Sequence, residues 1–345
     1  MTEHTDRPVG ERSPGPLVDT FGRIARDLRI SITDRCNFRC VYCMPEEEMT
    51  FAPRSEILSY EEITRLASLF VGFLGVTSIR LTGGEPTVRR DLDRLVSLLS
   101  SLETPHGVPL ELSMTTNGST LARQADLLRQ CGLSRVNISL DTLKAGRFAE
   151  ITRRDALGPV LAGIDAAVRA GFSPVKVNVV VVRGRNDDEV VDFATFGRER
   201  SVQVRFIEYM PLDASGSWSL DQVVSGDEII ERVASVYPLE PVAHGPEPAT
   251  LWRYLDGAGE IGVIPSVTKP FCASCDRVRL TAEGHFLTCL FAVEELDLRQ
   301  PLRSGANDAE LAQLISGAVA GKWAGHHIGR VDFVRPSRSM SQIGG

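Results

Sequence analysis

Six of the seven cysteines in this 345-residue chain stand in two triplets, and cysteine thiolates are strong metal ligands. Cys36, Cys40 and Cys43 have the spacing C-x3-C-x2-C in "RISITDRCNFRCVYCMP". The second triplet has the spacing C-x2-C-x13-C and consists of Cys272, Cys275 and Cys289. A closed structural metal site takes four protein ligands, whereas a catalytic site leaves one position open. Two triplets therefore favour two metal centres that each bind a further ligand.

Two kinds of centre fit such a triplet. Three thiolates can bind three irons of a [4Fe–4S] cube and leave the fourth iron open. The alternative for each triplet is a structural zinc ion with a fourth ligand from elsewhere, a distant residue for the first triplet and a zinc knuckle for the second. The seventh cysteine, Cys131, stands alone in "LLRQCGLSRV" and is expected to be a small buried hydrophobe near a helix end.

Composition narrows the class of protein. The chain is 43% hydrophobic and 24% charged, as expected for a soluble globular protein. Its net charge of −7 argues against a nucleic-acid binder, and the absence of a long apolar run argues against a membrane protein. Residues 1–20 are rich in polar residues, proline and glycine, which predicts a disordered tail without a secretory signal. We therefore expect a cytoplasmic protein whose cysteines serve metal or redox chemistry.

Short strand-like runs alternate with amphipathic helical runs, which predicts a parallel sheet with right-handed crossovers. The expected strands are 28–33, 76–82, 110–116, 134–140, 174–182 and 201–208, and the expected helices are 60–74, 91–102, 121–130, 157–170 and 187–200. A closed barrel of this type has eight units. Six units predict an α/β fold, an open, partial (βα)6 TIM-like barrel over residues 21–235. The second triplet would lie in a C-terminal extension, 236–345.

The predicted strands carry apolar residues on one face and polar residues on the other. The polar set is Arg29, Ser31, Thr33, Arg80, Thr82, Ser113, Thr115, Asn137, Ser139, Asp141, Lys176, Asn178, Gln203 and Arg205. The interior of an ordinary barrel is filled with branched apolar side chains, and buried polar groups need partners. The pattern favours a large polar ligand inside the barrel. The alternative is that some strands turn this face to solvent or lie at an edge.

Distinctive loops follow five of the predicted strands. They read "CNFRCVYC", "TGGEP", "TTNG", "SLDT" and "IEYMP". In parallel barrels the carboxyl ends of the strands form the rim at which active sites lie. We therefore expect these five loops to surround one site, with the first cysteine triplet in it.

The C-x3-C-x2-C loop after the first strand, together with "TGGEP" after the second, resembles the radical S-adenosylmethionine (SAM) superfamily. Within it, "LRISITDRCNFRCVYCMP", "VKVNVVVVRGRNDDE", "RFIEYMP", "FCASCDRVRL" and a final "IGG" resemble the GTP 3′,8-cyclases of molybdenum cofactor biosynthesis. The resemblance runs from about Phe21 to Gly345 and is weakest over 237–256 and in the helices. The longer N-terminal tail departs from the family but touches no motif.

The resemblance implies the roles of individual residues. Each cysteine triplet would hold one [4Fe–4S] cluster. The implied SAM contacts are Tyr42, Gly84, Ser139 and Met210. The implied GTP contacts are Arg29, Arg80, Thr115, Lys176, Arg277 and Arg279. For the two arginines of "CDRVRL" the alternative is an ordinary exposed hairpin. Five of these ten residues also belong to the inward polar set, so the two arguments point to one cavity.

The resemblance also implies a reaction and partners. A 5′-deoxyadenosyl radical removes hydrogen from C3′ of GTP, and attack on C8 gives (8S)-3′,8-cyclo-7,8-dihydroguanosine 5′-triphosphate. Cyclic pyranopterin monophosphate synthase would convert this product. An unidentified electron donor and a homodimer are implied as well.

Two other functions stay open. One is a radical SAM enzyme that modifies a peptide, although the sequence contains no evident peptide-recognition domain. The other is a zinc-stabilised binding module without catalysis.

Overall fold

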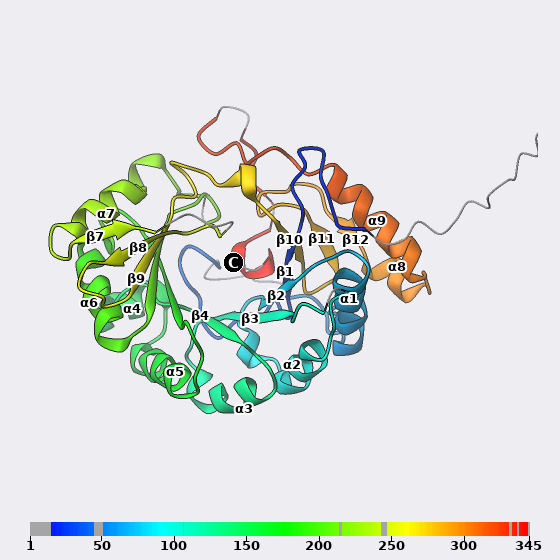
Figure 1. Ribbon diagram of the computed structural model, residues 1–345, viewed down its shortest axis with the longest axis horizontal. Coiled ribbons are helices and arrows are strands. Elements are labelled where there is room, and N and C mark those ends of the chain that lie inside the picture. The colour runs from blue at the N-terminus through cyan, green and yellow to red at the C-terminus, as the bar shows by residue number, and fades with distance from the viewer. Residues whose placement is uncertain are drawn as a thin grey trace, which may run out of the picture.

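The computed structural model describes residues 15–44, 51–105, 107–213, 216–242, 247–330, 333–336 and 338–343. Six parallel strands follow one another in chain order and curve into an arc (Figure 1). They are β1 (Asp27–Ser31), β2 (Ser78–Thr82), β3 (Glu111–Thr116), β4 (Arg135–Ser139), β5 (Lys176–Val181) and β6 (Gln203–Glu208). The predicted six-stranded partial barrel is confirmed.

The C-terminal region lengthens this sheet at both edges, which the sequence did not predict. Strand β10 (Arg277–Leu280) lies parallel to β1, and β9 (Glu260–Ile264) lies parallel to β6. Antiparallel partners complete the edges: β11 (His285–Leu287) and β12 (Leu296–Asp297) beyond β10, and β8 (Thr250–Tyr254) and β7 (Leu239–Pro241) beyond β9. The sheet order does not close on itself among the described residues, so the barrel stays open.

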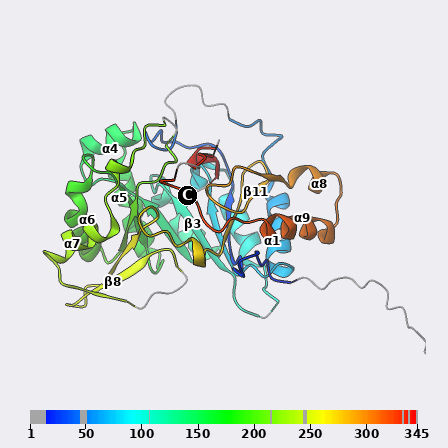
Figure 2. The same ribbon diagram turned by 90° about the horizontal axis from the view of Figure 1, so that it is seen from above.

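Helices cover the outside of the arc in Figure 1. Along the barrel they are α1 (Tyr60–Gly72), α2 (Leu92–Ser100), α3 (Ala125–Gln130), α4 (Ala145–Thr152), α5 (Leu157–Arg169), α6 (Val190–Arg200) and α7 (Gly226–Ala234). The extension adds α8 (Arg299–Arg303), α9 (Asp308–Ala320) and α10 (Met340–Ile343). Figures 1 and 2 place α10 inside the arc of strands, near the middle of the molecule.

The expected helices begin and end close to the observed ones, with four differences along the barrel. The first turns of 121–130 and 187–200 are 3-10 helices, Leu121–Arg123 and Asp187–Glu189, rather than α-helix. Helices α4 and α7, of eight and nine residues, were not predicted. Cys131 caps the end of α3, as expected, but it is only partly buried against the core.

The two faces of the strands divide as the alternation predicts. The apolar residues of β1–β6, such as Leu28, Ile79 and Phe206, are fully buried under the helices. Polar residues of the opposite face, such as Arg29 and Lys176, line cavities inside the arc. The apolar side therefore forms the core, and the polar side forms the site.

The N-terminal segment differs in part from the expected disordered tail. Residues 1–14 lie outside the described residues. From residue 15 the chain packs on the barrel: Leu17 is buried, and its amide donates to the carbonyl of Leu74. Within the described ranges, the helices are all too short or too polar to span a lipid bilayer.

Candidate active site

The first cysteine loop leaves the end of β1 and is held by helix α4. The amides of Arg39 and Val41 donate to the carbonyls of Thr152 and Ile151, which lie at the end of α4. A helix end leaves its last carbonyls without intrahelical partners, so they are free to bind such amides. Phe38 adds an edge-to-face contact with Phe148 of the same helix, at 5.8 Å between ring centroids. The unpredicted helix α4 therefore positions Cys40.

A buried carboxylate, Glu85 of "TGGEP", joins three loops of the rim. It accepts hydrogen bonds from the hydroxyls of Thr87 and Thr116 and from the amide of Asn117, at 2.5–2.6 Å. The Asn117 side chain in turn donates to Asn37 in the cysteine loop and lies 3.9 Å from the Cys36 sulfur. Glu85 thus fixes the third rim loop against the first, a role that the sequence did not reveal.

The two glycines of "TGGEP" are required because this loop packs closely against the backbone that leads into the first cysteine loop. A Cβ at Gly83 would lie 2.3 Å from the carbonyl oxygen of Thr33, and one at Gly84 would lie 2.2 Å from that of Arg35. The family resemblance implies that Gly84 contacts SAM. The structure supplies a different reason for both glycines, because the backbone of the cysteine loop itself occupies that space.

All four residues implied as SAM contacts line one cavity of about 200 Å³, together with the three cysteines of the first loop. Tyr42 and Ser139 come from the first and fourth rim regions, and Gly84 and Met210 from the second and sixth. The Tyr42 hydroxyl donates to Asp141, whose other oxygen accepts from the amide of Val180 at 2.8 Å. Burial raises the pKa of Asp141 to about 6. The ring of Tyr42 is therefore held in a fixed orientation.

The thiols of the first triplet are costly to ionise without a positive partner. Burial raises the pKa of Cys36 to about 11 and that of Cys43 to about 12, and it raises that of Cys40 as well. The amide of Phe38 lies 3.4 Å from the Cys36 sulfur, a contact suited to a thiolate. Thiolates here fit ligation to a cationic metal centre, which would supply the missing charge.

All six residues implied as GTP contacts line a second cavity, of about 650 Å³. Three arginines are cross-strand neighbours, because Arg29 pairs in register with Arg279 of β10 and with Arg80 of β2. The lining contains eight arginine and lysine side chains, against four aspartate and glutamate side chains. Such an excess of cations in a concave site suits a polyanion.

Burial and neighbouring cations disfavour the charged state of Arg29 and Lys176 in this cavity. Burial, and then Arg80 and Arg279, lowers the pKa of Arg29 well below its usual value. Burial, and then Arg205 and Arg135, lowers the pKa of Lys176 to about 7. The Nε atoms of Arg29 and Arg277 have no hydrogen-bond acceptor among the described residues. Anionic oxygens would satisfy these donors and restore the charged state of Lys176.

Several polar residues of the site were not assigned from the sequence. Arg205 belonged to the inward polar set without a role, and it donates to Glu247 at 2.6 Å. Glu247 lies in a loop whose pattern gave no signal, 3.7 Å from the Lys176 ammonium. The hydroxyls of Ser31 and Thr82, paired in register on β1 and β2, are buried and have no partner among the described residues.

The second triplet lies beside this cavity, at the start of β10. Arg23 is held by Asp19 and donates to the carbonyls of Cys272 and Ala324, at 2.7 and 2.9 Å. Asp19, in the segment expected to be a disordered tail, thus holds Arg23, the residue that anchors a cysteine loop. The Cys289 sulfur lies 3.4 Å from the amide of Phe291. Burial raises the Cys275 pKa, but Arg277 and Lys322 outweigh it and bring that pKa below its usual value.

Among the described residues, no three histidine, cysteine, aspartate or glutamate side chains converge on a single-ion site. In a [4Fe–4S] cube each thiolate binds a different iron, so the three sulfurs need not meet around one point. The donor set of each triplet, three cysteines with amide or ammonium groups near the sulfurs, fits such a cluster.

The C-terminal helix α10 reaches both cavities. Met340 lines the two of them, Ser341 and Ile343 are buried, and the Ile343 carbonyl accepts from Arg279 at 3.3 Å. Hydrogen bonding from Ser341 partly offsets the rise that burial causes in the pKa of Cys43. Gly344 and Gly345, which the sequence singled out, lie outside the described residues.

Two family descriptions match the chain. Residues 30–197 match the radical SAM superfamily, and residues 202–328 match Molybdenum Cofactor Synthesis C. A protein of Mycolicibacterium smegmatis named GTP 3′,8-cyclase is 48% identical over 96% of this chain and 92% of its own length. The chain belongs to the GTP 3′,8-cyclase family. One of Corynebacterium glutamicum with the same name is 46% identical over 95% of this chain and 89% of its own length.

Membership confirms the function predicted from the sequence. The protein is a radical SAM enzyme that cyclises GTP in molybdenum cofactor biosynthesis. Its cofactors are SAM and two [4Fe–4S] clusters, as expected. The zinc-stabilised module without catalysis is therefore wrong, and so is the peptide-modifying enzyme.

Solved structures show the same fold at low identity. SuiB of Streptococcus suis, bound to its precursor peptide SuiA, superposes with a TM-score of 0.60 at 13% identity, over 87% of this chain and 68% of that one. The SAM-bound form of SuiB gives a TM-score of 0.54 over 85% of this chain and 69% of that one. These likenesses concern the fold alone.

Proposed function

We propose that the two adjoining cavities are the SAM and GTP sites of this cyclase. Cys36, Cys40 and Cys43 would hold the cluster at the SAM cavity. Tyr42, Gly84, Ser139 and Met210 would contact SAM. When bound, these cofactors supply the 5′-deoxyadenosyl radical that takes hydrogen from C3′ of GTP. The protein's own share is to place the two ligands in contact and keep water out.

The second cavity would receive GTP. Arg29, Arg80, Thr115, Lys176, Arg277 and Arg279 would contact it, and Cys272, Cys275 and Cys289 would hold the second cluster nearby, which would supply an open ligand position for the guanine. The unsatisfied guanidinium groups would bind the triphosphate, because arginine donors match phosphate oxygens. Arg205 would join them, provided that Glu247 gives up its ion pair. The buried hydroxyl of Thr82, which lines the SAM cavity, would add a polar contact there.

The observation that carries this proposal is that the two cavities share part of their lining. Residues that line both cavities are Thr115, Asn178, Ile207, Met210 and Met340. A ligand over the first cysteine loop and one among the arginines would therefore meet with no strand between them. Transfer of a hydrogen atom requires such contact between the reacting groups.

The division of the chain and its partners complete the proposal. Residues 21–235 would form the SAM barrel, and residues 236–345 the auxiliary-cluster and GTP-binding region. The enzyme would act in the cytoplasm as a homodimer. It would take electrons from a donor still to be identified, and cyclic pyranopterin monophosphate synthase would consume its product. The family resemblance supports these points.

Iron analysis tests the assignment of the cysteines. Anaerobically reconstituted protein is expected to contain roughly eight irons per chain, since each triplet would hold one [4Fe–4S] cluster. Changing Cys272, Cys275 and Cys289 together to alanine should leave about four. A parent protein that holds about four irons after full reconstitution would contradict the second cluster site.

The pH dependence of GTP binding tests the substrate cavity. Without ligand, Lys176 has a pKa of about 7, so above that pH it is largely neutral. GTP favours the charged amine of Lys176, so above pH 7 its binding must be accompanied by uptake of a proton. Below pH 7 Lys176 already carries that proton. Affinity is expected to fall by up to tenfold per pH unit from about pH 7.5 to 9. Calorimetry in buffers of different ionisation enthalpy measures both affinity and proton uptake.

Lys176→Arg is the matched control, because a guanidinium keeps its charge over this range. It should bind GTP with a nearly flat pH profile and without proton uptake. If the parent profile is as flat as that of the arginine variant, Lys176 does not face the GTP phosphates.

A further inference from the structure

Lys322 is a buried cation directed at the second cysteine loop. It follows the end of α9 and is 4% exposed. Its ammonium donates to the carbonyls of Arg277, at 2.9 Å, and Cys275, at 3.1 Å, and lies 3.7 Å from the Cys275 sulfur. Three donors thus meet three acceptors, all of them on one loop.

Within the described part of the chain Lys322 makes no ion pair with a carboxylate, but its charge acts on Asp276, where it counteracts the rise that burial causes in the pKa. Arg23 pairs with Asp19 and Lys269 pairs with Asp227, whereas no ion pair joins Lys322 to an acidic side chain there. Burying an ammonium is costly unless an anion compensates it. The neutral carbonyls satisfy its hydrogen bonds but leave its positive charge. The Cys275 thiolate, 3.7 Å from the ammonium, lies closer to it than the Asp276 carboxylate, which forms no ion pair with Lys322.

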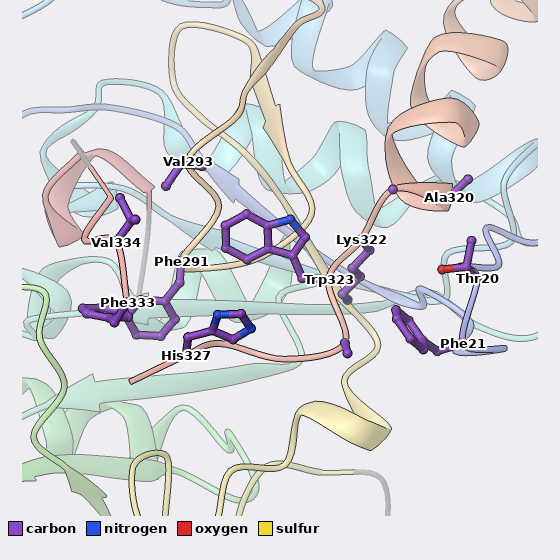
Figure 3. A pocket seen from close by; sticks show the side chains of 12 residues that line it. Thr20, Phe21, Phe291, Val293, Ala320, Lys322, Trp323, His327, Phe333 and Val334 are labelled. Atoms are coloured by element: carbon purple, nitrogen blue, oxygen red, sulfur yellow. The ribbon is translucent and has the colours of Figure 1, made fainter. Parts of the chain in front are cut away.

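Lys322 is nearly fully buried, although it lines a pocket whose wall includes Trp323, which is 42% exposed. Figure 3 shows Lys322 in the wall of a pocket with Trp323, His327, Phe291 and Phe333. Trp323 and His327 stack, with 6.3 Å between ring centroids, and Phe291 meets Phe333 edge to face at 5.9 Å. A side chain that is 4% exposed lies in a low effective dielectric, which strengthens the action of its charge on its neighbours.

Lys322 also differs from the other cations near this loop. Arg277 and Arg279 line the GTP cavity, where a bound triphosphate would neutralise them, but Lys322 does not line it. Its charge therefore stays in place whether or not substrate is bound.

We propose that Lys322 is a positioning residue that sets the reduction potential of the second [4Fe–4S] cluster. The inference rests on the proposed ligation of that cluster by Cys272, Cys275 and Cys289. Adding one electron makes a cluster more negative, so a fixed positive charge beside a ligand sulfur stabilises the reduced state. Charge and hydrogen bonds at the sulfurs are established determinants of cluster potentials.

The test compares holoenzymes in which Lys322 is changed to glutamine or to arginine. Glutamine keeps a hydrogen-bond donor without the charge, and arginine keeps the charge. The reductive midpoint of the second cluster is followed by electron paramagnetic resonance during titration with a chemical reductant. The signal that persists when Cys36, Cys40 and Cys43 are all alanine identifies this cluster.

For Lys322→Gln, the ratio of reduced to oxidised second cluster at a fixed potential is expected to fall at least tenfold. That change corresponds to a shift of 59 mV to lower potential for a one-electron couple. Lys322→Arg should stay close to the parent. The control is Lys269→Gln, which removes the same charge three residues before Cys272, from a side chain that is 64% exposed. Its cluster should titrate like that of the parent.

An unchanged potential in Lys322→Gln, with eight irons per chain, would overturn the inference. The glutamine variant could lose the second cluster altogether. If Lys322→Arg then retains the cluster, the site needs a positive charge. If both variants lose the cluster, Lys322 has a packing role instead. A parent protein without a second cluster would refute the proposed ligation itself, which iron analysis detects separately.

Discussion

Arg277→Ala and Arg279→Ala are each expected to weaken GTP binding by about 30-fold or more while leaving basal cleavage of SAM intact. An arginine that binds phosphate in a buried site leaves charged oxygens without donors when it is removed, a loss of roughly 2–5 kcal/mol. Both side chains line the larger cavity, and Arg279 is 4% exposed. Neither lines the SAM cavity. Equilibrium binding of GTP and release of 5′-deoxyadenosine under strong chemical reduction measure the two effects.

Two further variants give this experiment its contrast. Cys36→Ala should lose the slow cleavage of SAM as well as cyclisation, because cleavage needs the first cluster. Arg253→Ala removes an arginine from β8 that is about half exposed and pairs with Glu240 and Glu260. It should bind GTP like the parent. Iron must be measured in every variant, because a lost second cluster would mimic lost binding. Parent-like affinity in both cavity arginine variants, with full iron, would refute this placement of the triphosphate.

The sequence predicted the barrel well because the strand pattern is dictated by burial on one face. Apolar residues at alternate positions pack under the helices, so the opposite face had to be polar. That alternation alone predicts a common cavity for Arg29, Arg80 and Lys176, and all three line the larger one. The cysteine spacing likewise predicts two metal centres, and the assignment of the individual cysteines as ligands stays a prediction.

What the sequence did not reveal depends on contacts between distant segments. The edge strands β9 and β10 are separated from their partners β6 and β1 by long stretches of chain, so no local pattern marks the pairing. Glu85 looks like an ordinary acidic residue until Thr116 and Asn117 are seen to surround it. The anchoring of Cys272 by Arg23 joins residues 249 positions apart.

The alternative of an ordinary exposed hairpin for "CDRVRL" was wrong, again because of a contact between distant segments. Strand β10 does form a hairpin with β11, but β10 also pairs with β1, which buries Arg279. The pairing turns a surface arginine into part of the cavity. Its chemistry was predicted from the neighbouring cysteines, whereas its burial could not be.

Removal of Gly344 and Gly345 is expected to abolish cyclisation while leaving the fold and both clusters intact. Chain ends are usually dispensable, but this one follows a helix that is buried in the site. Ile343 is 1% exposed, its carbonyl accepts from Arg279, and Met340 lines both cavities. The truncation shifts the terminal carboxylate onto Ile343, beside an arginine proposed to bind GTP. Product analysis, iron content and circular dichroism measure the three outcomes.

The matched control is a truncation at the other end. Deleting residues 2–14 removes a longer polar segment but stops before Leu17, whose burial begins the packed part of the chain. That variant should cyclise GTP like the parent. The C-terminal truncation should still cleave SAM slowly, because the first cysteine loop is held by α4 and by the network around Glu85 rather than by the last two residues. Loss of cyclisation with retained cleavage and full iron would locate the defect in the placement of GTP. Full cyclisation activity in the truncated enzyme would show that the last two residues are dispensable, however deeply Ile343 is buried.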